Sequence, residues 1–151
     1  MGVKELGHIV LYVRDMERSR TFYELALGWP AITGFNLGGT SATAFSVGRT
    51  HHDLLLIEVG EGATPIPPGR RVGMYHFGVK VGDTDDELRE MRDRLIEHGV
   101  TIVGTADHTI THSLYILDPD GNEIELYTDV AGVDWKSDPT AILAPIRALR
   151  L

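Results

Sequence analysis

Hydrophobic and polar positions follow the same order in the two halves of the chain. Residues 7–13 and 75–81 alternate between polar and apolar positions as strands do, and each stretch carries one histidine, His8 or His76. Each stretch leads to an aspartate and then to a helical spacing that stops at a glycine. Short β-like segments follow each helix. The pattern predicts two βαβββ modules.

Helices are expected at residues 15–28 and 83–99. In the second, Thr84 and Glu87 have the spacing of a capping box, in which two side chains satisfy free backbone N–H groups of the first turn. Its predicted buried stripe consists of Leu88, Met91, Leu95 and Ile96. The first helix has a less regular stripe of Phe22, Leu25 and Ala26. Further strands are expected at 32–37, 43–47, 52–59, 100–105, 113–117 and 122–128.

A stretch rich in proline and glycine, residues 61–73, falls midway and is typical of a boundary. The modules then cover about 5–60 and 73–129, each too small to be stable alone, so we expect them to share one core in a single α+β domain, 1–151. The tail, 130–151, reads as a short amphipathic segment that covers a strand edge or contributes to a dimer contact.

Composition excludes several classes of function. A formal net charge of −8 argues against nucleic acid and anionic membranes, which attract basic surfaces. The absence of cysteine excludes disulfides, thiolate metal sites and a thiol nucleophile. No apolar run reaches the length of a membrane span, and the N-terminus lacks the layout of a signal peptide. We therefore expect a soluble cytoplasmic protein.

Ionisable residues gather on the predicted strands. Alternation places His8 and His76 at equivalent points of the two modules, each on the face opposite an apolar row. The turn at 118–122 separates Tyr115 and Glu125 evenly, so in a simple hairpin they face each other on neighbouring strands.

A lone histidine is more often structural than a ligand, but recurrence at one place in both modules favours a ligand. Two imidazoles and a carboxylate with open positions suit Fe(II) or another divalent first-row metal.

The order of His8, His76 and Glu125, the last within DPDGNEIELY, resembles the vicinal oxygen chelate superfamily over about residues 6–129. That superfamily includes glyoxalases, epimerases, fosfomycin-resistance proteins and type I extradiol dioxygenases. The resemblance implies two βαβββ modules with a cupped mixed sheet around a metal site, for which His8, His76 and Glu125 would be the ligands.

Three further features resemble the extradiol branch of the catechol 2,3-dioxygenase type. The dipeptide at 51–52 resembles the family's His-His entry to the fourth strand, which makes His52 the catalytic acid/base. The segment from Asp107 resembles the one with a second active-site histidine, matched by His108, with His112 as an alternative. Tyr115 matches the active-site tyrosine. Many members of this branch have two domains and about twice this length, so this would be a single-domain form.

The resemblance implies an Fe(II)-dependent extradiol dioxygenase, with Mn(II) as another compatible ion. It would combine a catechol with O2 and release a ring-opened, muconic semialdehyde-type product. His52 would move a catechol proton, and Tyr115 and His108 would hydrogen-bond the substrate. We expect a homodimer that binds neither nucleic acid nor membrane.

A rival interpretation uses Glu58, which follows His8 by 50 residues, as Glu125 follows His76 by 49. The two histidines and two glutamates would form a four-ligand site like that of glyoxalase I or methylmalonyl-CoA epimerase, which act as isomerases. That chemistry gives no reason for His52, His108 and Tyr115 together. A third class, a binding protein like the bleomycin-sequestering members, lacks the metal ligands that this sequence retains.

Overall fold

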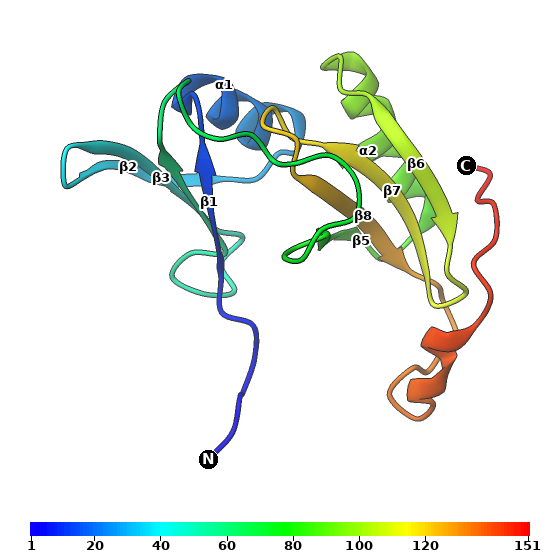
Figure 1. Cartoon of the computed structure of the whole chain (residues 1–151). Helices are drawn as coiled ribbons and strands as arrows, with labels where there is room; N and C mark the ends of the chain where they lie inside the picture. The colour runs from blue at the N-terminus through cyan, green and yellow to red at the C-terminus, as the bar shows by residue number, and fades with distance from the viewer. The chain divides into compact units, whose positions relative to one another are not determined.

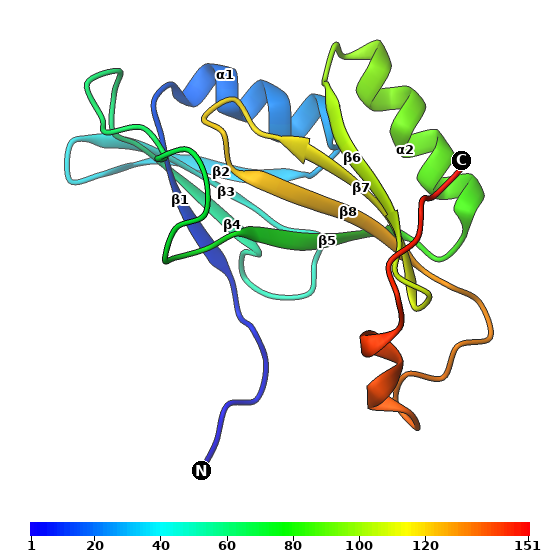
Figure 2. The same cartoon turned by 45° about the vertical axis from the view of Figure 1, so that its right-hand side comes forward.

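The computed structural model describes residues 1–151 as two compact units, Met1–Pro65 and Ile66–Leu151 (Figures 1 and 2). Each unit contains one βαβββ module, as the hydrophobic pattern predicts, and together they make an α+β protein. The predicted single core shared by the two modules stays a prediction. None of the helices is long and apolar enough to cross a bilayer.

The first unit has a four-stranded mixed sheet in the order β1-β4-β3-β2. Its elements are β1 (Ile9–Val13), α1 (Met16–Thr21), the π-helix η1 (Phe22–Ala26), β2 (Ala31–Leu37), β3 (Thr40–Phe45) and β4 (Leu54–Glu58). β1 and β4 are parallel, and the other pairs are antiparallel. The helix covers one face of this sheet, where its core residues are fully or nearly fully buried: Leu11, Val13, Tyr23, Phe45, Leu54 and Leu56.

The second unit repeats this order as β5-β8-β7-β6. Its elements are β5 (His76–Gly82), α2 (Asp85–Glu97), β6 (Ile102–Asp107), β7 (Thr111–Leu117), β8 (Glu123–Asp129) and the 3-10 helix η2 (Pro139–Leu143). β5 and β8 are parallel, and α2 packs on β5, β7 and β8. The buried residues between helix and sheet are Leu88, Leu95, Leu114, Ile116, Ile124 and Leu126.

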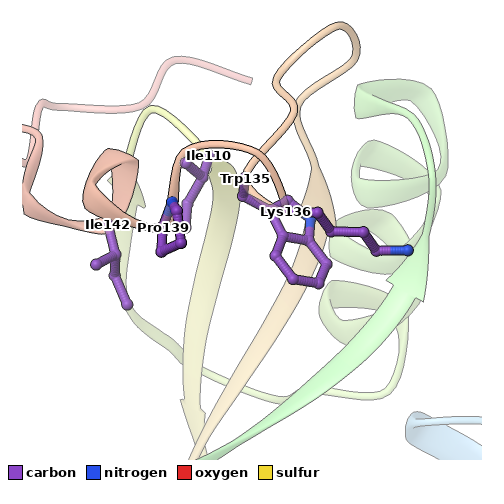
Figure 3. A pocket seen from close by; sticks show the side chains of 5 residues that line it. All are labelled: Ile110, Trp135, Lys136, Pro139 and Ile142. Atoms are coloured by element: carbon purple, nitrogen blue, oxygen red, sulfur yellow. The ribbon is translucent and has the colours of Figure 1, made fainter.

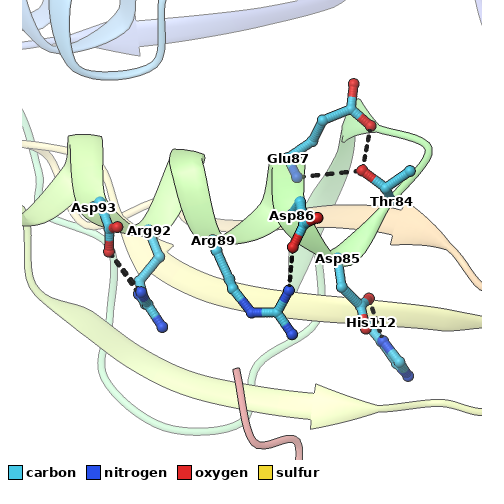
Figure 4. Close-up of polar contacts among 8 residues, drawn as sticks. All are labelled: Thr84, Asp85, Asp86, Glu87, Arg89, Arg92, Asp93 and His112. Carbon is cyan, nitrogen blue, oxygen red and sulfur yellow. Dashed lines mark hydrogen bonds and ion pairs between the residues drawn. The ribbon is translucent and has the colours of Figure 1, made fainter.

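The predicted caps of both helices are present. The Asp15 carboxylate accepts from the backbone N–H of Arg18, and in α2 Thr84 and Glu87 form the capping box (Figure 4). Gly28 and Gly99 follow the helices with φ of 67° and 69°, a left-handed conformation that glycine adopts without strain.

The predicted helix stripes are partly wrong. In α2, Leu88 and Leu95 are buried as expected, but Ile96 is largely exposed. In the first unit Leu25 is half exposed, while Tyr23, which the pattern left out, is fully buried. In the first unit the buried stripe consists of Ser19, Phe22, Tyr23 and Ala26, which is the ordinary i, i+3, i+4, i+7 spacing, and Leu25 lies outside it. Ile96 directly follows the buried Leu95, so it lies about 100° further round α2.

The C-terminal tail, orange to red in Figures 1 and 2, returns to the edge strand β6. The backbones of Asp107 and Arg147 exchange two hydrogen bonds, and the Thr105 hydroxyl donates to the carbonyl of Leu149. The tail therefore covers a strand edge, one of the two roles that the sequence left open.

Candidate functional site

Glu125 stands at the centre of a polar cluster on the sheet of the second unit. It lies in the middle of β8, opposite Gly78 of β5 on one side and Tyr115 of β7 on the other. The tight turn before β8 sets this register, so the predicted pairing of Tyr115 with Glu125 is confirmed. The strand residues that alternate with Tyr115 and Glu125 are apolar and point to the face that α2 covers. The polar side chains therefore point to the opposite face.

The two oxygens of the Glu125 carboxylate have different neighbours. Oε1 accepts hydrogen bonds from the Ser113 hydroxyl at 2.7 Å and the Tyr115 hydroxyl at 3.1 Å. Oε2 lies 3.2 Å from Nε2 of His76. Two donors therefore fix one oxygen, and the other is left facing the imidazole.

His108 joins this cluster through Tyr115. Its Nε2 lies 2.7 Å from the Tyr115 hydroxyl and 3.7 Å from Oε1 of Glu125. A hydroxyl has one proton, so if Tyr115 donates it to Glu125, it accepts from a protonated Nε2 of His108. Burial first, and then Glu125, raise the pKa of Tyr115, which keeps this hydroxyl protonated at neutral pH.

The turn that carries His108 has an unusual backbone. Thr109 has φ of 72°, a left-handed conformation that a β-branched residue rarely adopts. Its N–H donates to the Asp107 carboxylate at 2.7 Å, and the N–H of His108 donates to the carbonyl of Thr111. Strained positions of this kind concentrate at functional sites, which agrees with a functional role for His108.

His112 does not belong to this cluster. Its neighbour Ser113 points toward Glu125, so alternation along β7 sends the His112 side chain to the face under α2. There its Nδ1 lies 2.6 Å from the carboxylate of Asp85, the first residue of α2 (Figure 4). Of the two histidines that the sequence left open, His108 lies beside Tyr115 and Glu125 and His112 does not; the role of His108 in the site stays a prediction.

A second cluster lies in the first unit and consists of three histidines. The ring centres of His8 and His52 are 4.3 Å apart, and Nδ1 of His51 lies 2.6 Å from Nδ1 of His52. Nε2 of His52 is buried without a hydrogen-bond partner. Burial first, and then the neighbouring His8 and His51, lower the pKa of His52, which favours a neutral imidazole.

Glu58 does not occupy the place that the rival interpretation requires. The register pairs Ile9 with Leu54 as it pairs Phe77 with Ile124, so the counterpart of Glu125 is Leu55. Glu58 lies three residues further on. An odd step along a strand changes the face, and the Glu58 carboxylate accepts from the backbone N–H of Met16 at the start of α1. The predicted equivalence of Glu58 and Glu125 is wrong.

Neither unit alone gathers three or more His, Cys, Asp or Glu side chains that could hold a metal ion. The second unit does contain a fitting pair. Two ligands at right angles on a first-row ion lie about 3 Å apart, since each metal bond is about 2.1 Å. Nε2 of His76 and Oε2 of Glu125 meet this spacing at 3.2 Å. A Cβ at Gly78 would make ordinary van der Waals contact with the Tyr127 ring at 3.4 Å and with the same Glu125 oxygen at 3.8 Å.

A separate pocket of about 350 Å³ lies beside the turn that carries His108 (Figure 3). It is lined by Ile110, Trp135, Lys136, Pro139 and Ile142, and none of the predicted site residues contributes to it. Its lining is mainly apolar, and the Lys136 side chain extends away from the apolar group.

Comparison with known proteins defines the family. The profile of the Glyoxalase/Bleomycin resistance protein/Dioxygenase superfamily matches residues 5–126. The chain belongs to this superfamily. A crystal structure of a glyoxylase/bleomycin resistance protein/dioxygenase domain from Frankia sp. EAN1pec covers 85% of the chain with a TM-score of 0.71 and 22% identity. At this identity the likeness concerns the fold, which is glyoxalase-like.

Sequence relatives in the superfamily have different activities. Catechol-2,3-dioxygenase of Bacillus subtilis (strain 168) is 35% identical over 133 residues, 88% of this chain and 44% of that protein. Biphenyl-2,3-diol 1,2-dioxygenase 2 of Rhodococcus globerulus is 29% identical, over 83% of the chain and 63% of that protein. Glutathione transferase FosA of Serratia marcescens is 29% identical, over 83% of the chain and 81% of that protein. The chain thus spans about half the length of the two dioxygenases.

Ser113 is a residue of the Glu125 cluster that the sequence did not predict. Ser113 is fully buried and donates to the carboxylate, but a single serine on a strand carries no distinctive signal. The hairpin register could have found it, because Ser113 precedes Tyr115 by two residues and so shares its face.

Proposed function

We propose that the chain is an extradiol ring-cleaving dioxygenase that acts on a catechol and O2. The observation that carries this proposal is the chain of contacts from His108 through Tyr115 to Glu125 and His76. It joins a metal-ligand pair to two hydrogen-bonding groups suited to a phenolic oxygen. The similarity to a catechol-2,3-dioxygenase points to the same reaction class.

The proposed metal ligands are His8, His76 and Glu125. Two neutral imidazoles and one carboxylate suit Fe(II), with Mn(II) as the other candidate. When bound there, Fe(II) would supply a template for the catechol and the redox chemistry that links the ring to O2. Both oxygen atoms would enter the product, a muconic semialdehyde-type compound.

Each proposed catalytic residue has a role that follows from its surroundings. The Tyr115 hydroxyl and Nε2 of His108 would hydrogen-bond a catechol oxygen and hold the ring in register. His52 would accept a catechol proton and return it when the O–O bond breaks, because its buried Nε2 has no protein partner. A homodimer in the cytoplasm stays the expectation for assembly and location.

The strand register argues against the four-ligand isomerase. Its fourth ligand would come from the strand position that pairs with Val10, and that position is Leu55, which has no donor atom.

The decisive experiment loads the purified protein with Fe(II) without oxygen and then adds a catechol and air. We expect oxygen uptake together with a yellow ring-fission product, and a rate reduced by about 10²–10⁴ in His52→Ala. His98→Ala, an exposed histidine after α2, is the matched control and should retain the rate. Absence of product across a panel of catechols, with isomerisation of a hemithioacetal under Ni(II) or Zn(II) instead, would overturn the proposal.

A further inference from the structure

Glu123 lies beside the proposed ligand His76, although no role in the site has been given to it above. It is the first residue of β8 and pairs with His76 across the parallel ladder, two residues before Glu125 and on the same face. Its Oε1 lies 3.6 Å from Nδ1 of His76. Its side chain is about a quarter exposed, so it is largely withdrawn from solvent.

Nδ1 of His76 is a buried polar atom without a hydrogen-bond partner. Such atoms are rare, because a buried N–H that has lost its water costs about 1–3 kcal/mol unless an acceptor replaces it. If Nε2 binds a metal, the proton of the neutral ring must sit on Nδ1. The group facing that atom is the Glu123 carboxylate.

We infer that Glu123 is the positioning residue for His76: its carboxylate accepts the Nδ1 proton and directs the Nε2 lone pair toward the metal. This inference rests on the proposed function, since it assumes that His76 is a ligand. A carboxylate behind a ligating imidazole fixes the ring orientation and makes the ligand nitrogen more basic.

Two features hold Glu123 in place for this role. The preceding turn is rigid, because the buried Asp118 carboxylate accepts from the backbone N–H groups of Asp120 and Asn122 and from the Asn122 side chain. Tyr75 is the second, because the charge of the nearby Glu123 carboxylate is the largest cause that raises the pKa of Tyr75. The ring of Tyr75 lies 4.6 Å from the ring of His76, centre to centre, so it flanks both members of the pair.

The test measures metal binding, not turnover. Co(II) is titrated into the metal-free protein, and the dissociation constant is obtained for the wild type, Glu123→Gln, Glu123→Leu, Tyr75→Phe and His76→Ala. We expect Glu123→Leu to weaken binding about 10–100-fold. Glu123→Gln should weaken it less, because the amide oxygen still accepts a hydrogen bond, and Tyr75→Phe should have a smaller effect again.

Two controls separate positioning from general effects. Glu97→Gln removes one negative charge from an exposed residue at the end of α2, so it reports how net charge alone affects cation binding. The melting temperature of each metal-free variant reports damage to the fold. In the Zn(II)-loaded protein, NMR should show a slowly exchanging Nδ1 proton of His76, assigned by its loss in His76→Asn, and Glu123→Leu should abolish it.

The outcomes are distinct. A wild type that does not bind Co(II), or binding unaffected by His76→Ala, would overturn the proposed function and this inference together. Binding that depends on His76 but changes less than twofold in Glu123→Leu would overturn the inference alone. Weakened binding with an unchanged apo melting temperature, together with loss of the Nδ1 proton signal, would establish it.

Discussion

Replacing Ser113 with alanine should destabilise the metal-free protein through the loss of one hydrogen bond. Ser113 is fully buried, and its hydroxyl donates to Oε1 of Glu125 at 2.7 Å. A hydrogen bond to a charged group contributes about 1.5–3 kcal/mol. The Glu125 side chain is 17% exposed, so water screens part of the interaction, and we expect the lower end of this range. For a chain of this size that corresponds to a fall in melting temperature of at least about 3 °C.

The first unit supplies a matched control. Ser19 is also fully buried, but its hydroxyl has no hydrogen-bond partner. Ser19→Ala removes the same atom without breaking a bond and relieves the cost of a desolvated hydroxyl, so the melting temperature should stay unchanged or rise. Comparing the two variants separates the contribution of the hydrogen bond to Glu125 from the effect of removing a buried hydroxyl.

Thermal unfolding followed by circular dichroism measures both variants, and a double-mutant cycle with Glu125→Gln isolates the pair. We expect a coupling free energy of about 1 kcal/mol or more between Ser113 and the charged form of Glu125. A coupling near zero, or equal shifts for the two serine variants, would refute the view that Ser113 orients the carboxylate.

Three other predictions follow from the contacts. His108→Ala should lower the rate of ring cleavage about 10²–10⁴-fold with little change in melting temperature, whereas His112→Ala should lower the melting temperature but keep the rate within a few-fold; the reverse pattern would refute the assignment. Glu58→Gln should also keep the rate and lower the melting temperature, because its carboxylate accepts from Met16 at the start of α1. The backbone of Asp83 and then the Thr84 hydroxyl lower the pKa of Glu87 through hydrogen bonds, so its contribution to stability is present above the ordinary carboxyl value and is lost as pH falls through the lowered one. The melting-temperature difference between the wild type and Glu87→Gln should therefore be largest at neutral pH and vanish once the pH falls below the lowered pKa of Glu87, and a pH-independent difference would contradict this.

The sequence predicts the site where local geometry determines it. A tight turn connects β7 and β8, and strand alternation has a period of two, so counting residues from the turn placed Tyr115 opposite Glu125 correctly. The capping box at Thr84 and the glycines after both helices are equally local features.

Sequence reasoning predicts a residue's position wrongly where that position depends on the pairing of strands far apart in the chain. Counting from His8 to Glu58 assumes equal loop lengths in both modules, and a difference of a few residues moved the inferred position from Leu55 to Glu58. Tyr23 was missed for another reason: its buried stripe has ordinary helical spacing but starts at a polar residue, Ser19, which a hydrophobic pattern does not count. Ser113 and Glu123 look like ordinary strand residues until their partners are known.

Leucine at position 55 means that the repeat offers one carboxylate, Glu125, to the proposed donor set. Two neutral imidazoles and one carboxylate would leave a bound divalent ion with one positive charge uncompensated. Leu55, the repeat counterpart of Glu125, has no carboxylate with which to compensate it. A centre with residual positive charge attracts an anion, such as a catechol that has lost a proton, while a neutral centre does not. One apolar side chain in the repeat thus favours an anionic ligand without contributing a donor atom.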